Sequence, residues 1–148
     1  MFEDLRDLYQ DVIMDHGRKP RHGRRLEVFD AQAKGDNPMC GDRVTVFIRS
    51  DSGKIADLGF EARGCAISIA SADLMAEAVI GRTPDEIASL ARRFAAMAKS
   101  GSTSDPDLQT LRALGGVAEY PSRVKCATLP WAALTAALAA QPGVATSE

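Results

Sequence analysis

Long apolar runs and an excess of positive charge are both missing from this sequence of 148 residues. No stretch approaches the roughly 18 uninterrupted apolar residues that a membrane-spanning helix requires, so we expect no membrane contact. The net charge of −2 and the pI near 5.7 lack the basic excess that neutralises a phosphate backbone, which argues against a nucleic-acid partner. The acidic segment 1–7 has neither a basic n-region nor an apolar h-region, so we expect no signal peptide and a cytoplasmic protein.

Cysteine is also scarce, and the three cysteines, Cys40, Cys65 and Cys126, lie far apart. An odd number cannot pair completely within the chain, and a reducing cytosol disfavours disulfides, so we expect thiols. None belongs to a C-x-x-C pair, the arrangement typical of structural zinc sites. The spacing alone leaves two interpretations open: a shared metal site, or three separate buried thiols that act as small hydrophobic residues.

What the sequence does contain is ordinary for a soluble globular protein, with 45% apolar and 26% charged residues. A chain of this length fits one domain, which buries about 68–70% of the surface that the unfolded chain exposes. We predict a single domain over residues 1–141 and a flexible tail over residues 142–148.

The N-terminal half is predicted to contain a helix and a small sheet. Apolar residues at helical spacing indicate a helix over residues 2–16. We expect a short strand over residues 26–31, followed by a turn over residues 34–38. Alternating apolar residues on either side of a turn at residues 51–53 predict an antiparallel hairpin between residues 44 and 60.

The C-terminal half is predicted to be helical. An apolar run over residues 66–80 is typical of a buried helix, and Thr83-Pro84-Asp85-Glu86 has the capping pattern that begins another, expected to end near Lys99. A short helix around residues 108–114 and a last helix beginning near Cys126 complete the prediction. The chain is therefore predicted to be an α+β domain, a small antiparallel sheet of about three strands covered on one side by helices.

The surroundings of the cysteines are compatible with a metal site at one exposed end of this domain, and separate buried thiols stay an equally open alternative. Cys40-Gly41-Asp42 places a thiol and a carboxylate at the mouth of a strand. Cys65 and Cys126 each come directly before a predicted helix, where unpaired amides and the helix dipole favour thiolate over thiol. Three sulfurs and one carboxylate oxygen suit tetrahedral Zn²⁺.

Several segments of the chain resemble the IscU-like iron-sulfur cluster assembly family, and together they span nearly its whole length. These segments are Leu8-Tyr9-Gln10, Val12-Ile13-Met14-Asp15-His16, Asn37-Pro38-Met39-Cys40-Gly41-Asp42, Gly64-Cys65-Ala66-Ile67-Ser68, Arg123-Val124-Lys125-Cys126-Ala127 and Leu129-Pro130-Trp131. Within this family the sequence is similar to the SufU branch. Lys125 stands where scaffold-type members carry a histidine, and the segment 81–116 lengthens the gap before the third cysteine.

The resemblance implies a division of labour among the site residues. Zinc would be held by Cys40, Asp42, Cys65 and Cys126, and Cys40 would also accept persulfide sulfur from a PLP-dependent cysteine desulfurase of the SufS-like kind. The chain would then act as a sulfurtransferase that supplies a downstream iron-sulfur scaffold. Two alternatives stay open: a scaffold on which an iron-sulfur cluster is itself assembled, and a structural zinc domain that serves an unrelated interaction.

Other residues carry weaker predictions. Arg123 is a candidate catalytic residue that covers the site, with a surface salt bridge as the alternative. His16 is interpreted as capping its helix and Trp131 as part of the core. The desulfurase-facing surface is predicted to comprise the first helix and the basic residues Arg18, Lys19, Arg21, Arg24 and Arg25.

Overall fold

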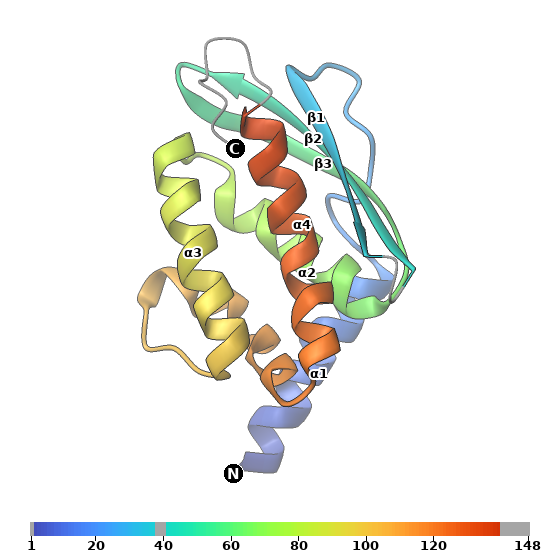
Figure 1. Ribbon diagram of the computed structural model, residues 1–148, viewed down its shortest axis with the longest axis vertical. Helices are drawn as coiled ribbons and strands as arrows, with labels where there is room; N and C mark the ends of the chain where they lie inside the picture. Colours follow the sequence, from blue (N-terminus) through green and yellow to red (C-terminus); the bar gives the residue numbers. More distant parts are fainter. Residues whose placement is uncertain (1, 38–40, 140–148) are drawn as a thin grey trace.

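A computed structural model describes residues 2–37 and 41–139, with side chains from residue 10 onward (Figure 1). Cys40 and the predicted tail over residues 142–148 lie outside the described residues. The elements in chain order are α1 (Phe2–Arg18), β1 (Ala31–Asn37), β2 (Asp42–Asp51), β3 (Lys54–Arg63), α2 (Ala66–Val79), α3 (Pro84–Ser100), the 3₁₀ helix η1 (Pro106–Glu119) and α4 (Pro121–Ala139). The predicted α+β class is confirmed.

The three strands form one antiparallel sheet in the order β1-β2-β3. Ser52 and Gly53 join β2 to β3 with positive φ angles of 54° and 80°, the backbone typical of a tight hairpin turn. Alternate residues Val44, Val46 and Ile48 are buried on the face that the helices cover. Figure 1 shows this one-sided arrangement, in which α4 packs against β1 and β2, and α2 packs against β3.

The predicted strand over residues 26–31 is wrong, and so is the predicted turn over residues 34–38 as far as Asn37, the last described residue of that segment. The chain instead runs across the outer face of the sheet, where the ring of Phe29 lies 5.1 Å from that of Phe47, and β1 begins only at Ala31. β1 then continues through the supposed turn to Asn37, which pairs with Asp42. The packing of α4 on β1 favours glycine at position 35, because a Cβ there would come within 3.0 Å of Leu129.

The helices agree with the prediction more closely, except in the last third of the chain. The Thr83 capping box of α3 is present, with Glu86 N–H donating to Thr83 Oγ1 at 3.2 Å and Thr83 N–H donating to Glu86 Oε1 at 3.1 Å. The predicted short helix is the longer η1, which continues past both of its glycines to Glu119. The helix α4 begins at Pro121, five residues before the predicted start at Cys126, with proline in the first helical position, where it needs no donor.

The core lies between the sheet and the helices. Trp131 of α4 belongs to it, as predicted, and stacks on Phe94 of α3 with ring centroids 4.8 Å apart. Among the helices that the structure describes, none combines the length and the apolar character needed to cross a membrane.

Candidate metal centre

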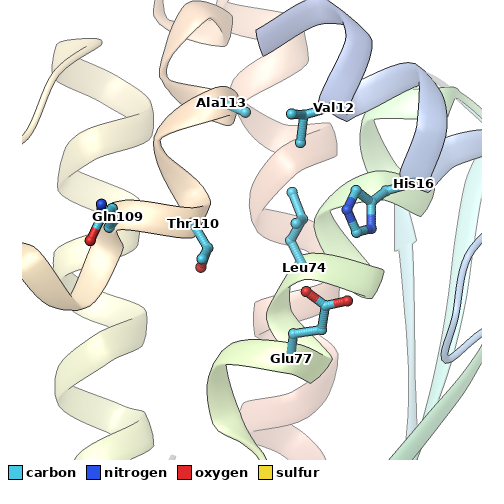
Figure 2. Close-up of a pocket in the computed structure, with 7 residues that line it drawn as sticks. All are labelled: Val12, His16, Leu74, Glu77, Gln109, Thr110 and Ala113. Carbon is cyan, nitrogen blue, oxygen red and sulfur yellow. The ribbon is translucent and has the colours of Figure 1, made fainter. Parts of the chain in front are cut away.

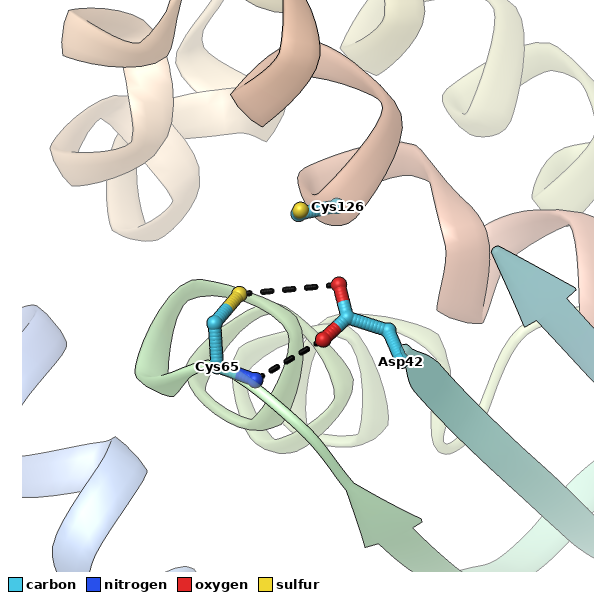
Figure 3. Close-up of side chains that lie close together, drawn as sticks. All are labelled: Asp42, Cys65 and Cys126. Carbon is cyan, nitrogen blue, oxygen red and sulfur yellow. Dashed lines mark hydrogen bonds between the residues drawn. The ribbon is translucent and has the colours of Figure 1, made fainter. Parts of the chain in front are cut away.

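Three of the four predicted zinc ligands converge where β2, α2 and α4 meet. Asp42 begins β2, Cys65 directly precedes α2, and Cys126 lies in α4. One donor atom from each lies within 4.8 Å of the other two (Figure 3). Asp42 and Cys126 are buried, whereas Cys65 is partly exposed. Cys40, the fourth predicted ligand, lies outside the described residues, two positions before Asp42.

Asp42 is held in place by the residue it faces. Its Oδ1 accepts a hydrogen bond from the Cys65 backbone N–H at 2.8 Å, and its Oδ2 lies 3.6 Å from Cys65 Sγ. Cys65 is the N-cap residue of α2, in the extended conformation, with no side-chain capping bond. An unpaired amide at the start of a helix is therefore satisfied by a carboxylate, which the positive end of the helix dipole also favours.

Gly64 allows this close approach. Its φ is 128°, a conformation that side-chain-bearing residues rarely adopt, and a Cβ at this position would overlap Asp42 Oδ1 and lie 2.8 Å from Asp42 Cα. The glycine before the second cysteine is thus required both by the backbone and by the space that the Asp42 carboxylate fills.

Cys126 is positioned differently from the sequence prediction. Because α4 begins at Pro121, Cys126 lies in the second turn of the helix and not at its N-terminus, so the expected stabilisation of its thiolate by the dipole of that end does not apply. The side chain is fully buried, and its Sγ lies 3.5 Å from the carbonyl oxygen of Ser122, one turn earlier. Only Cys65 occupies the helix-terminal position that was predicted for both.

Arg123 lies at the rim of this cluster, one turn before Cys126 on α4. The negative charge of the Cys65 thiolate raises the pKa of the Arg123 guanidinium, and hydrogen bonding to the Cys126 side chain acts in the same direction. The exposed guanidinium of Arg123 therefore lies beside the sulfur atoms of Cys65, which is half-buried, and Cys126, which is buried. Its role in a reaction stays a prediction.

The donor set fits zinc in chemistry and in spacing. Tetrahedral zinc with Zn–S near 2.3 Å and Zn–O near 2.0–2.2 Å sets sulfur and oxygen ligands roughly 3.5 Å apart. Asp42 Oδ2 and Cys65 Sγ are 3.6 Å apart. The site combines two soft thiolate ligands with one hard carboxylate ligand. Zinc binds both kinds, whereas magnesium and calcium prefer oxygen ligands alone.

Two of the five residues of the predicted basic surface are paired with carboxylates within the molecule. Arg21 donates to Asp15 at 2.6 Å, and Arg24 lies 3.4 Å from Asp57. Arg25 stacks over the aromatic rings on the outer face of the sheet. The cationic character of the loop is therefore smaller than its composition indicates.

His16 does not have the capping role that we predicted. The helix α1 continues past it to Arg18, and His16 Nδ1 instead lies 2.5 Å from Oδ2 of Asp73, a buried carboxylate of α2. The sequence offered one signal of this contact, because Asp73 is the single charged residue in the predicted apolar run before Glu77.

Comparison with known proteins agrees with this fold and site. Residues 8–143 match the family described as NifU-like N terminal domain, and the chain belongs to that family. It is 38% identical over 144 residues to the zinc-dependent sulfurtransferase SufU of Bacillus subtilis, covering 95% of each chain. It is also 38% identical over 135 residues to the iron-sulfur cluster assembly scaffold protein IscU of Streptococcus pyogenes serotype M1, covering 90% of this chain and 84% of the relative.

Solved structures confirm the IscU/SufU-like fold. A putative iron-sulfur cluster assembly scaffold protein for the SUF system from Fervidobacterium islandicum superposes with a TM-score of 0.81 at 35% identity, covering 86% of this chain and 94% of the other. The N-terminal part of a NifU-like protein from Brucella abortus superposes with a TM-score of 0.80 at 25% identity, covering 90% and 94%.

Proposed function

We propose that this protein is a zinc-dependent sulfur acceptor, which takes persulfide sulfur from a cysteine desulfurase for iron-sulfur cluster biogenesis. The observation that carries the proposal is the convergence of Asp42, Cys65 and Cys126, whose donor atoms lie within 4.8 Å of one another. The printed name of the Bacillus subtilis relative, which the chain matches over 95% of both lengths, supports the same function. A cytoplasmic setting and a PLP-dependent, SufS-like desulfurase partner belong to this proposal.

The proposed reaction is an exchange between sulfur atoms. The thiolate of Cys40 attacks the outer sulfur of the desulfurase persulfide, so that a new sulfur-sulfur bond forms while the old one breaks. The desulfurase cysteine leaves as a thiolate, and Cys40 carries the persulfide. The numbers of electrons and atoms balance without an added oxidant, because the transferred sulfur already has the oxidation state it needs. A downstream iron-sulfur scaffold then receives that sulfur.

The remaining site residues bind the metal beside Cys40 or offset the negative charge of the ligands. Asp42, Cys65 and Cys126 complete the ligand set in the proposal, and bound zinc would keep the thiols deprotonated at neutral pH. Arg123 offsets part of the negative charge that these groups collect. We propose that it also attracts the anionic persulfide to the rim of the site, which would make it a participant in transfer.

The second candidate function is that of a scaffold on which an iron-sulfur cluster is assembled. It is favoured by the Streptococcus pyogenes relative, which is named as a scaffold and has the same 38% identity as the sulfurtransferase. Against it stands Lys125, beside Cys126, where scaffold-type members carry a histidine, because the lysine ammonium offers no lone pair to a metal.

One purified preparation separates these functions. We expect a colourless protein with about one tightly bound zinc per chain that accelerates its desulfurase several-fold. The Cys40→Ala variant should lose this acceleration, because it lacks the attacking thiolate. Mass spectrometry after one turnover should find one extra sulfur atom on the peptide that contains Cys40.

The controls test each part of the assignment. Lys99→Ala changes an exposed residue at the end of α3 and should leave acceleration unchanged. A Cys40→Ala protein that still accelerates the desulfurase would show that the acceptor is wrongly assigned. A brown protein with a labile cluster would favour the scaffold, and zinc without any acceleration would indicate a structural zinc domain.

A further inference from the structure

A second cluster of metal-binding side chains lies between α1 and α2, apart from the centre formed by Asp42 and the cysteines. His16, Asp73 and Glu77 each offer a donor atom within 4.8 Å of the others. His16 and Glu77 also line an open pocket of about 290 Å³ between α1, α2 and η1. Figure 2 shows the imidazole ring entering from α1 and the carboxylate of Glu77 from α2, with Thr110 of η1 across the pocket.

Asp73 fixes the orientation of the His16 ring. Its side chain is 0% exposed, its Oδ1 accepts the His22 backbone N–H at 2.8 Å, and its Oδ2 lies 2.5 Å from His16 Nδ1. Asp73 does not line the pocket, whereas His16, whose side chain is 13% exposed, does. With Nδ1 directed at the buried carboxylate, Nε2 is the ring nitrogen that remains for a ligand in the pocket.

This arrangement is the one that metal-binding histidines use. A histidine ligand generally donates its second ring N–H to a carboxylate, which sets the tautomer and raises the basicity of the coordinating nitrogen. Glu77 lies four residues after Asp73, and therefore one helical turn further along the same side of α2, where its carboxylate is exposed. One imidazole nitrogen and one carboxylate oxygen suit a borderline cation such as Zn²⁺, with water in the other positions.

We propose that His16 Nε2 and the Glu77 carboxylate form a second divalent-cation site of the zinc class, with Asp73 as its positioning residue. The pocket leaves room for the water molecules that two protein ligands require, and the hydroxyl of Thr110 stands on its far wall. The site differs from the cysteine centre in ligand type, since it uses nitrogen and oxygen alone.

Neighbouring charges set the expected strength of this site. The guanidinium of Arg21 is close enough for the charges of Asp73 and Glu77 to raise its pKa, although its main partner is Asp15 at 2.6 Å. The positive charge of Arg21 repels a bound cation and offsets part of the attraction that the Asp73 and Glu77 carboxylates exert on it. The second site therefore binds zinc more weakly than the thiolate centre and exchanges it faster.

The test is a zinc titration of the full chain after it has bound its first equivalent. Because the chain has only two histidines, nitrogen-detected NMR of the imidazole rings resolves them individually. A second equivalent of Zn²⁺ should shift the Nε2 signal of His16 and leave the ring of His22 unchanged. Glu77→Gln should lower the second affinity by about tenfold or more. Glu27→Gln, which removes the same charge from an exposed loop position, should not alter it.

Three results would overturn this site: no second equivalent bound, equal zinc uptake by Glu77→Gln and Glu27→Gln, or a shift at His22 in place of His16. The state of the cysteine centre is read separately from the same samples. Co²⁺ bound there gives a thiolate charge-transfer band, whereas Co²⁺ bound by nitrogen and oxygen alone does not. Loss of the His16 shift with the thiolate band intact thus rejects the second site without affecting the proposed sulfur transfer.

Discussion

Replacing Gly64 with alanine should damage the metal centre without touching any predicted ligand. The added Cβ would overlap Asp42 Oδ1 and come within 2.8 Å of Asp42 Cα, a backbone atom that cannot move independently. The Asp42 carboxylate must therefore shift, which lengthens or breaks the 2.8 Å hydrogen bond that it accepts from the Cys65 backbone N–H. The φ of 128° adds backbone strain, because a side chain at this position rarely adopts it.

The size of the effect follows from these two contributions. A residue held in a sparsely populated backbone region costs about 1–3 kcal/mol. Losing a hydrogen bond to a charged group costs about 1.5–3 kcal/mol. The metal-free Gly64→Ala protein should therefore be less stable by about 2.5–6 kcal/mol in total. Zinc affinity should fall by about tenfold or more as well, since the displaced Asp42 no longer presents its oxygen correctly.

Gly53→Ala is the matched control. Gly53 also has a positive φ, 80°, but a Cβ there would have no neighbour within 4 Å. It should cost only the conformational strain, about 1–2 kcal/mol, and leave zinc affinity unchanged. Urea denaturation of chelator-treated proteins and zinc competition with a chromophoric chelator measure both quantities. If Gly64→Ala proved no more damaging than Gly53→Ala, the close packing of Gly64 on Asp42 would be refuted.

Three further substitutions test the fold. Thr83→Ala removes the cap of α3 and should cost about 1 kcal/mol in urea denaturation, whereas no loss would mean that the capping box does not contribute. Asp73→Asn should cost about 1–3 kcal/mol by weakening a buried acceptor, and its NMR spectrum should show the His16 ring reoriented; an unchanged ring would contradict the contact. The Arg93 hydrogen bond lowers the pKa of Asp105 from its ordinary value of 3.8, so ionised Asp105 stabilises the fold above pH 3.8 and this contribution disappears as the pH falls through the lowered pKa. Asp105→Asn should thus lower the free energy of unfolding near pH 7 and have no effect in strong acid. A difference between variant and unaltered protein that stays constant across this pH range would contradict the prediction.

Local signals were sufficient wherever one segment determines its own structure. The capping pattern beginning at Thr83 contains all the partners that α3 needs, and the hairpin turn at Ser52 and Gly53 is likewise self-contained. The apolar run that became α2 has no competing interpretation. These elements were predicted correctly from residues close together in the sequence.

The parts that were predicted incorrectly contain residues that occur in two kinds of structure. Gly35 is typical of a turn in isolation, but it lies in β1 opposite Val44, and a Cβ there would come within 3.0 Å of Leu129 on α4. The last helix was predicted to begin near Cys126, but α4 begins at Pro121, which places Cys126 in its second turn. Glycine occurs in turns and in strands, and proline both ends helices and begins them, so local sequence does not distinguish the two roles.

The residues of the metal centre were predictable from the sequence, but the hydrogen bonds that position them were not. Asp42, Cys65 and Cys126 were grouped by resemblance, since their spacing left separate thiols equally open, and the structure brings the three together. The hydrogen bond between the Cys65 amide and Asp42 joins positions 23 residues apart, which no sequence pattern indicates. The pairing of His16 with Asp73 spans 57 residues and was missed for the same reason.

X-ray absorption at the zinc edge identifies the atoms that bind the metal in the proposed centre. On protein loaded with one equivalent of zinc, we predict three sulfur ligands near 2.3 Å and one oxygen at about 2.0–2.2 Å, which requires Cys40, Cys65 and Cys126 together with Asp42. The Cys40→Ala protein should lose one sulfur and keep two. A spectrum with fewer than three sulfurs in the unaltered protein, or one dominated by nitrogen and oxygen, would show that this ligand set is wrong.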